Sequence, residues 1–199
     1  MSDKSVIINT TVMAVIGGAA MVSAVALLPD EDAVADARDR IGVSYAHLDF
    51  TGFDFFSSPR PAPDISFSDA AGNSLDFDSF DDKILLVNLW ATWCPPCIRE
   101  MPSLDRLQAE LGGESFEVVT LSVDEGGLEQ VEPFFEDLEL ADLSIYLDPE
   151  SQSTRAFDTR GLPTTVLIDR TGRWIATYEG AMDWDAPNVI DLMEQVIEL

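Results

Sequence analysis

The chain has 199 residues, of which 37 are acidic and 11 basic, so its formal net charge is −26. Charge of this sign and size repels phosphate backbones and argues against nucleic-acid binding. A hydrophobic fraction of 46% is typical of a folded protein and too high for a disordered acidic chain. We interpret the acidity as a solubilising surface, with an acidic patch that docks basic partners as the alternative.

Residues 1–4 form a short tail, and the 24 residues of 5–28 carry no ionisable side chain. As a helix this run would be about 36 Å long, enough to cross a hydrocarbon core of about 30 Å. The pattern predicts an uncleaved transmembrane helix that serves as an N-terminal anchor. A signal peptide cleaved near residues 24–26 is the alternative.

The basic residues around the apolar run do not decide its orientation, because Lys4 precedes it and Arg38 and Arg40 follow it. A very short tail before a first span more often stays inside the cell. We therefore expect a single-pass protein of the cell inner membrane, with its catalytic domain on the periplasmic or extracytoplasmic side.

Residues 29–63 are interpreted as an acidic, proline-rich connecting region. Its phenylalanines indicate that part of it packs on the body of the protein. Prolines at alternate positions predict a stiff, extended spacer at its end. The phenylalanines are Phe50, Phe53, Phe55 and Phe56, and the prolines are Pro59, Pro61 and Pro63.

Residues 64–199 alternate between strand and helix patterns, which predicts one α/β domain with a parallel or mixed sheet flanked by helices. The expected strands are 65–67, 84–90, 116–123, 143–147, 164–168 and 174–178. The expected helices are 96–111, 128–138 and 187–199, with Asp185 as the cap of the last one.

Both cysteines of the chain, Cys94 and Cys97, lie where the buried strand gives way to the first of these helices. The positive end of the helix dipole favours a thiolate at Cys94, and Cys97 is one turn further in. Thiol–disulfide exchange needs an exposed attacking thiol and a second thiol that resolves the mixed disulfide. A bridge across two residues constrains an unfolded chain little, so a purely structural disulfide is the less favoured alternative.

The sequence has few residues that could form a metal site, a cofactor site or a peroxidase site. With two cysteines and one histidine, His47, far from them, we expect no four-ligand zinc site, and a metal site on the two cysteines would need a partner protein or unusual ligands. No nicotinamide or flavin fingerprint is present, so we expect no cofactor. A peroxidase-like use of Cys94 is disfavoured, because the spacing of Thr92 from it is wrong.

The segment Leu86–Pro102 resembles, almost residue for residue, the signature of the TlpA/ResA-like thiol–disulfide oxidoreductases, a membrane-anchored branch of the thioredoxin superfamily. Residues 116–124 are similar to that family's second strand, and Gly161–Thr165 to its cis-proline loop. The resemblance covers about residues 64–180 and implies a thioredoxin-like fold with a central mixed sheet. The first 63 residues match only in having an anchor.

The resemblance also implies roles for single residues. Cys94 would attack a substrate disulfide, and Cys97 would resolve the mixed disulfide. Pro163 would be a cis proline that faces the disulfide, where the backbone of Leu162 could pair with a substrate strand; an ordinary turn proline is the alternative. Glu100 either exchanges protons with Cys97 or is a solvated residue of the helix face. The other residues expected to face the substrate are Trp93, Pro95 and Pro96, whereas Trp90 is expected in the core.

Asn88 bears on which group takes up the proton, and Pro95 and Pro96 bear on the direction of electron flow. Asn88 stands where cytosolic thioredoxins carry a buried aspartate, and since asparagine takes up no proton, the acceptor must be Glu100 or water. Pro95 and Pro96 have no backbone N–H, so two donors that could stabilise a Cys94 thiolate are missing. We therefore expect a modestly acidified Cys94 and a reducing role.

These features together predict a membrane-anchored reductase of protein disulfides, supplied with electrons by a membrane thiol donor. The resemblance implies substrates such as apocytochrome c or copper-site proteins of the respiratory chain. An oxidase or isomerase of the same fold is one alternative. A membrane-tethered binding module with incidental cysteines is the other.

Overall fold

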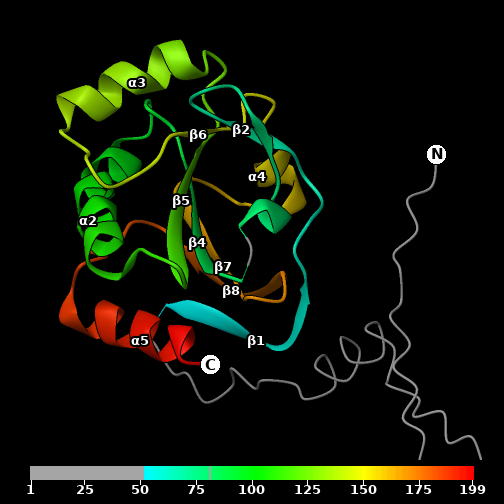
Figure 1. Cartoon of the computed structure of the whole chain (residues 1–199). Helices are drawn as coiled ribbons and strands as arrows, with labels where there is room; N and C mark the ends of the chain where they lie inside the picture. The colour runs from blue at the N-terminus through cyan, green and yellow to red at the C-terminus, as the bar shows by residue number, and fades with distance from the viewer. Residues whose placement is uncertain (1–51, 81) are drawn as a thin grey trace, which may run out of the picture. The chain divides into compact units, whose positions relative to one another are not determined.

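The computed structural model describes residues 52–80 and 82–199 (Figure 1). The predicted tail, the predicted anchor at 5–28 and the connecting region up to residue 51 lie outside the described residues. Within the described part, none of the helices combines the length and the apolar character that a membrane span requires.

One eight-stranded mixed sheet runs through the domain, in the order β1-β8-β7-β4-β5-β6-β2-β3. Strands β4, β5 and β6 run parallel to one another, and all other neighbours pair antiparallel. This arrangement confirms the predicted mixed sheet. The strands are β1 (Phe53–Pro61), β2 (Phe67–Asp69), β3 (Ser74–Leu75), β4 (Ile84–Trp90), β5 (Phe116–Ser122), β6 (Tyr146–Leu147), β7 (Thr164–Ile168) and β8 (Arg173–Glu179).

Helices cover both faces of this sheet, and Figure 1 shows α2 and α5 on the opposite side from α4. One core lies between the sheet and α2, α3 and α5, and a second lies under η2 and α4. The helices are η2 (Phe77–Ser79, a 3-10 turn), α2 (Pro95–Leu111), α3 (Leu128–Asp137), α4 (Gln152–Ala156) and α5 (Pro187–Ile197).

Strand β4 is buried along its whole length, as its continuous apolar sequence predicts. Its side chains alternate between the two cores: Leu86 and Trp90 belong to the first, and Leu85, Val87 and Leu89 to the second. Both faces of β4 are therefore packed. This packing fixes the position of its carboxyl end, where the cysteine segment starts.

The sheet begins at Phe53, before the boundary expected at residue 64. Strand β1 pairs antiparallel with β8, with Phe53 opposite Tyr178 and Pro61 opposite Arg173. Residues 53–61 are therefore part of the sheet and not a free-standing spacer. Prolines are tolerated here because β1 is an edge strand, where the missing N–H groups can face solvent. The predicted packing of Phe53 is confirmed, since its buried ring contacts those of Tyr178 and Trp184.

Two local predictions need correction. The strand expected at 143–147 is shortened to β6, because the N–H of Leu143 donates to Asp105 Oδ1 and not to a neighbouring strand. Asp185 does not cap α5, whose N-cap is Ala186 without a side-chain bond. The Asp185 carboxylate instead pairs with Arg106 of α2, which competes for it as a charged partner.

Candidate active site

A disulfide joins Cys94 and Cys97 at the N-terminus of α2, directly after β4. Cys94 is the N-cap residue of the helix and has an extended backbone. Its N–H donates to the carbonyl of Ala91 at 3.1 Å, which closes the turn that leads out of the strand. The predicted junction of buried strand and helix is confirmed.

The two sulfur-bearing side chains are both buried in this oxidised state. Cys94 is 5% exposed and Cys97 is fully buried, so the expected order of accessibility holds but Cys94 is less open than expected. Its sulfur is drawn towards the helix, where the N–H of Cys97 lies 3.4 Å from Cys94 Sγ. Trp93, by contrast, is 64% exposed and stands out from the surface beside the bridge.

The first turn of α2 offers Cys94 few hydrogen-bond donors. Pro95 and Pro96 occupy the first two helical positions and have no N–H. The donor that the structure places on Cys94 Sγ is the N–H of Cys97. Pro95 is exposed and Pro96 half-buried, so both rings border the surface around the disulfide.

Glu100 lies one turn after Cys97 and is only 2% exposed. It is therefore not the solvated helix-face residue of the alternative interpretation. Asn88 Nδ2 donates to its Oε1 at 2.8 Å, and Oε2 accepts from Trp184 Nε1 at 2.9 Å and from the Met182 N–H at 3.0 Å. Burial raises the pKa of the Glu100 carboxyl, and these three hydrogen bonds oppose part of that rise.

Asn88 is fully buried on β4 and connects the acid to the neighbouring strand. Its Nδ2 donates to Glu100 and also, at 2.9 Å, to Thr165 Oγ1 of β7. As the sequence indicates, a neutral amide occupies this position. The carboxyl of Glu100 is the group in this cluster that can take up a proton.

The bond between Leu162 and Pro163 is cis, as predicted. Pro163 is buried and directly precedes β7, whose first residue, Thr164, pairs with Leu89 near the end of β4. The proline loop and the disulfide therefore lie at the same end of the sheet, where β4 ends and β7 begins. Leu162 is half-buried there and leaves part of its surface open.

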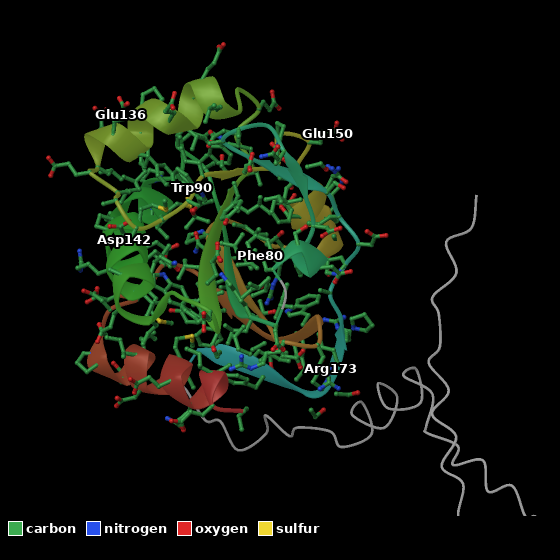
Figure 2. The ribbon with its side chains drawn as sticks, in the orientation of Figure 1. Phe80, Trp90, Glu136, Asp142, Glu150 and Arg173 are labelled. Carbon is green, nitrogen blue, oxygen red and sulfur yellow. A yellow bond between two sulfur atoms is a disulfide. The ribbon has the colours of Figure 1, made fainter. Side chains whose placement is uncertain are left out.

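Trp90 lies inside the core, as expected, between the sheet and α3 (Figure 2). Its ring contacts those of Phe134 and Phe135, with centroids 5.3 and 6.0 Å away. The two tryptophans that frame the cysteine segment thus differ in role. Trp90 is a packing residue, and Trp93 belongs to the surface.

The family model described as Redoxin matches residues 58–194. The chain belongs to the Redoxin family. The thiol-disulfide oxidoreductase ResA of Geobacillus thermodenitrificans (strain NG80-2) is 35% identical to it over 121 residues, which are 61% of this chain and 68% of the relative. ResA of Bacillus subtilis (strain 168) is 27% identical over 142 residues, which are 71% of this chain and 78% of the relative.

The fold of this redoxin also has solved counterparts. A crystal structure from Chlorobium tepidum, assigned as thiol:disulfide interchange protein DsbE, matches with a TM-score of 0.63 at 24% identity, over 72% of this chain and 98% of that one. The predicted TlpA/ResA-like membership of the thioredoxin superfamily is confirmed. This redoxin is a disulfide oxidoreductase.

Three partners of the site were not identified from the sequence. Trp184 and Met182 hold Glu100 from a segment more than 80 residues further along the chain. Asp124, beyond the end of β5, binds Thr92 in the active-site loop, which is residues 91–94 between β4 and α2. A weak signal existed for Asp124 alone, since the carboxyl ends of adjacent parallel strands meet at one edge of a sheet.

Metal ligands do not gather at this site. Among residues 52–80 and 82–199, no group of three or more His, Cys, Asp or Glu side chains could hold a metal ion.

Proposed function

We propose that this redoxin is a membrane-anchored, extracytoplasmic reductase of protein disulfides. The observation that carries the proposal is the Cys94–Cys97 bridge at the head of α2, at the same end of the sheet as the Leu162–Pro163 loop. The apolar run at 5–28 supports a single inner-membrane anchor, with the connecting region leading to a periplasmic or extracytoplasmic redox domain.

The reaction runs through a mixed disulfide. In the reduced enzyme, the Cys94 thiolate attacks one sulfur of the substrate disulfide, and the other substrate sulfur leaves as a thiolate. The Cys97 thiolate then attacks Cys94 Sγ and expels the second substrate thiolate. Two electrons pass to the substrate, whose two thiolates take up protons, and the enzyme is left with the Cys94–Cys97 disulfide. A membrane thiol donor restores the dithiol by the same exchange.

Glu100 is proposed as the proton acceptor for Cys97, which must lose its proton before it can attack. Both side chains are buried on α2, three residues apart, which places them on one face of the helix. Burial raises the pKa of Glu100 above its ordinary value, which makes its carboxylate a stronger proton acceptor. A thiol shielded from water needs such an internal acceptor.

The substrate strand is proposed to bind across the proline loop. Leu162 precedes the cis bond, and in this proposal its backbone pairs with an extended substrate segment and Pro163 faces the disulfide. Trp93, Pro95 and Pro96 supply the apolar surface next to Cys94. Such a surface fits a polypeptide substrate.

The small number of N–H groups that can donate to Cys94 Sγ supports a role as a reductase. A thiolate with few N–H donors is weakly stabilised, and a weakly stabilised thiolate makes the dithiol a better electron donor. We expect a reduction potential at or below about −270 mV, the value of thioredoxin. A measured potential near about −180 mV or above would instead indicate the oxidase or isomerase alternative.

By analogy with the family, the substrates include apocytochrome c or copper-site proteins of the respiratory chain. The test is to express the Cys97→Ala variant of the full chain, in which Cys94 can attack but nothing resolves the adduct. Mixed disulfides should accumulate in the membrane fraction, and mass spectrometry should identify the partners. The matched Cys94→Ala variant should trap far less.

Three observations would contradict parts of the proposal. Equal trapping by both variants would mean that Cys94 is not the attacking thiol. A partner-binding activity that survives in Cys94→Ser would favour the tethered binding module. Recovery of the full chain in the soluble fraction would contradict the anchor.

A further inference from the structure

A second buried carboxylate, Asp124, lies beside the start of the cysteine segment, where it binds Thr92. It follows β5 in the loop that leads to α3, and it is 1% exposed. Among the described residues it has no ion-pair partner. Burying a carboxylate is costly unless hydrogen bonds compensate for the lost water, so its partners show what it does.

Four donors surround the Asp124 carboxylate. Oδ2 accepts from the Thr92 N–H at 2.8 Å and from Ser122 Oγ at 2.9 Å. Oδ1 accepts from Thr92 Oγ1 at 2.8 Å and from Gln130 Nε2 at 2.6 Å. A carboxylate has about four lone-pair positions, so these four donors fill them.

The two hydroxyl groups of this network, on Ser122 and Thr92, each accept one hydrogen bond and donate one to the Asp124 carboxylate. Ser122 Oγ accepts from the Asp124 N–H at 3.1 Å, and Thr92 Oγ1 accepts from Gln130 Nε2 at 2.7 Å. Each hydroxyl therefore has its own hydrogen free to donate to the carboxylate. The network joins β5, α3 and the active-site loop through one charged group.

Thr92 is the residue on which the network converges in the active-site loop, and it lies two positions before Cys94. The loop leaves β4 after Trp90, whose carbonyl accepts from the Val123 N–H at 3.0 Å. It is tied again at Thr92, by both the backbone and the side chain. Between these ties and the helix stands Trp93, which is 64% exposed and so contributes little packing to fix the backbone.

We propose that Asp124 is a positioning residue for the active-site loop: by holding Thr92 it presents Trp93 and Cys94 to a protein substrate in one geometry. This inference rests on the proposed function, in which Cys94 attacks a protein disulfide. Orientation matters most for a large substrate, which must align its own backbone with the loop. A small disulfide reaches Cys94 without that alignment.

The test compares two substrates in single-turnover reactions of the reduced protein: insulin, and the small reagent 5,5′-dithiobis(2-nitrobenzoate). Asp124→Ala should slow insulin reduction about tenfold, the equivalent of one or two lost hydrogen bonds. Reduction of the small reagent should change about twofold or less. Asp124→Asn should recover most of the insulin rate, because reversed Gln130 and Thr92 groups can accept from the new amide.

Asp169 provides a matched control at the far end of β7. It is also a buried carboxylate with several donors, from Thr171 and Arg173 in the β7–β8 turn. Asp169→Ala should lower the urea midpoint of unfolding and leave both rates unchanged. Should Asp124→Ala fail to fold, Gln130→Ala removes one surface donor of the network and should slow insulin reduction about threefold.

The outcomes separate this inference from the proposed function. A wild-type protein that reduces neither substrate overturns both. A wild-type protein that reduces insulin, with an Asp124→Ala variant that is unaffected or equally slow on both substrates, overturns the positioning role alone. So does an Asp124→Asn variant as slow as Asp124→Ala on insulin.

Discussion

The two buried carboxylates close to the cysteine segment, Glu100 and Asp124, are held in contrasting ways. Glu100, on the α2 side, accepts from three N–H donors and keeps an acceptor position free. Asp124, on the α3 side, accepts from four donors and is saturated. Burial raises the pKa of Glu100. Glu100 therefore has an acceptor position to spare, whereas Asp124 uses all of its positions to hold its neighbours, Thr92 among them.

The largest effect is expected on the stability of the fold when Trp184, which holds Glu100, is replaced. This side chain is fully buried, packs on Phe53 and Tyr178, and donates to the carboxylate. Trp184→Ala should lower the free energy of unfolding by about 3–5 kcal/mol, mostly through the cavity it leaves. Urea unfolding of the oxidised protein measures it.

Trp184→Phe is the control that isolates the hydrogen bond. It keeps most of the ring packing and removes the N–H that reaches Glu100, so the loss should be about 1–3 kcal/mol. A Trp184→Phe variant as stable as the wild type at neutral pH would show that the indole N–H does not stabilise the buried acid.

The second prediction concerns the rate at which the mixed disulfide is resolved. Glu100→Gln removes the proposed proton acceptor and should slow this step about 10²-fold, the lower end of the usual range for general acid–base catalysis. Stopped-flow release of thiol from a preformed mixed disulfide measures it. Glu110→Gln, an exposed position on the same helix, is the control. An unchanged rate in Glu100→Gln would place the proton with water.

The amide of Asn88 makes the Glu100→Gln substitution structurally mild. Asn88 Nδ2 now donates to Glu100 and to Thr165 Oγ1. A reversed amide would present its oxygen to both residues, and could then accept from the new Gln side chain and from the Thr165 hydroxyl. The same reversal would serve a protonated Glu100, so Asn88 can bond the acid in either of its protonation states.

The chemistry of the disulfide could be predicted from the sequence because it is encoded locally. The apolar run of β4, the spacing of Cys94 and Cys97, and the proline before Thr164 are each readable within a few residues. The prolines after Cys94 likewise set the donor supply without reference to the rest of the fold. These predictions describe the structure well.

The contacts that tune the site could not be predicted in this way. Trp184 meets Glu100 across 84 positions of sequence, and no spacing rule connects them. Asp185 has the position expected of a helix cap, yet a charged partner on another helix binds it instead. Strand β1 was not expected because its prolines are typical of a spacer, and only the neighbouring β8 gives them an edge to occupy.

The smallest effect is the pH dependence of stability, which tests the Glu100 half of the comparison. A carboxyl whose pKa is raised in the folded state binds its proton more tightly there than in the unfolded chain. Folding is therefore increasingly penalised as the pH rises from the unfolded pKa, near 4.5, through the higher folded value of Glu100. Urea unfolding of the oxidised protein from pH 4 to pH 8 should show stability declining across that window. Glu100→Gln should flatten the decline, whereas Glu110→Gln should leave it in place. A profile that is the same in wild type and Glu100→Gln would mean that Glu100 has the same pKa in the folded and unfolded states, and that burial does not raise it.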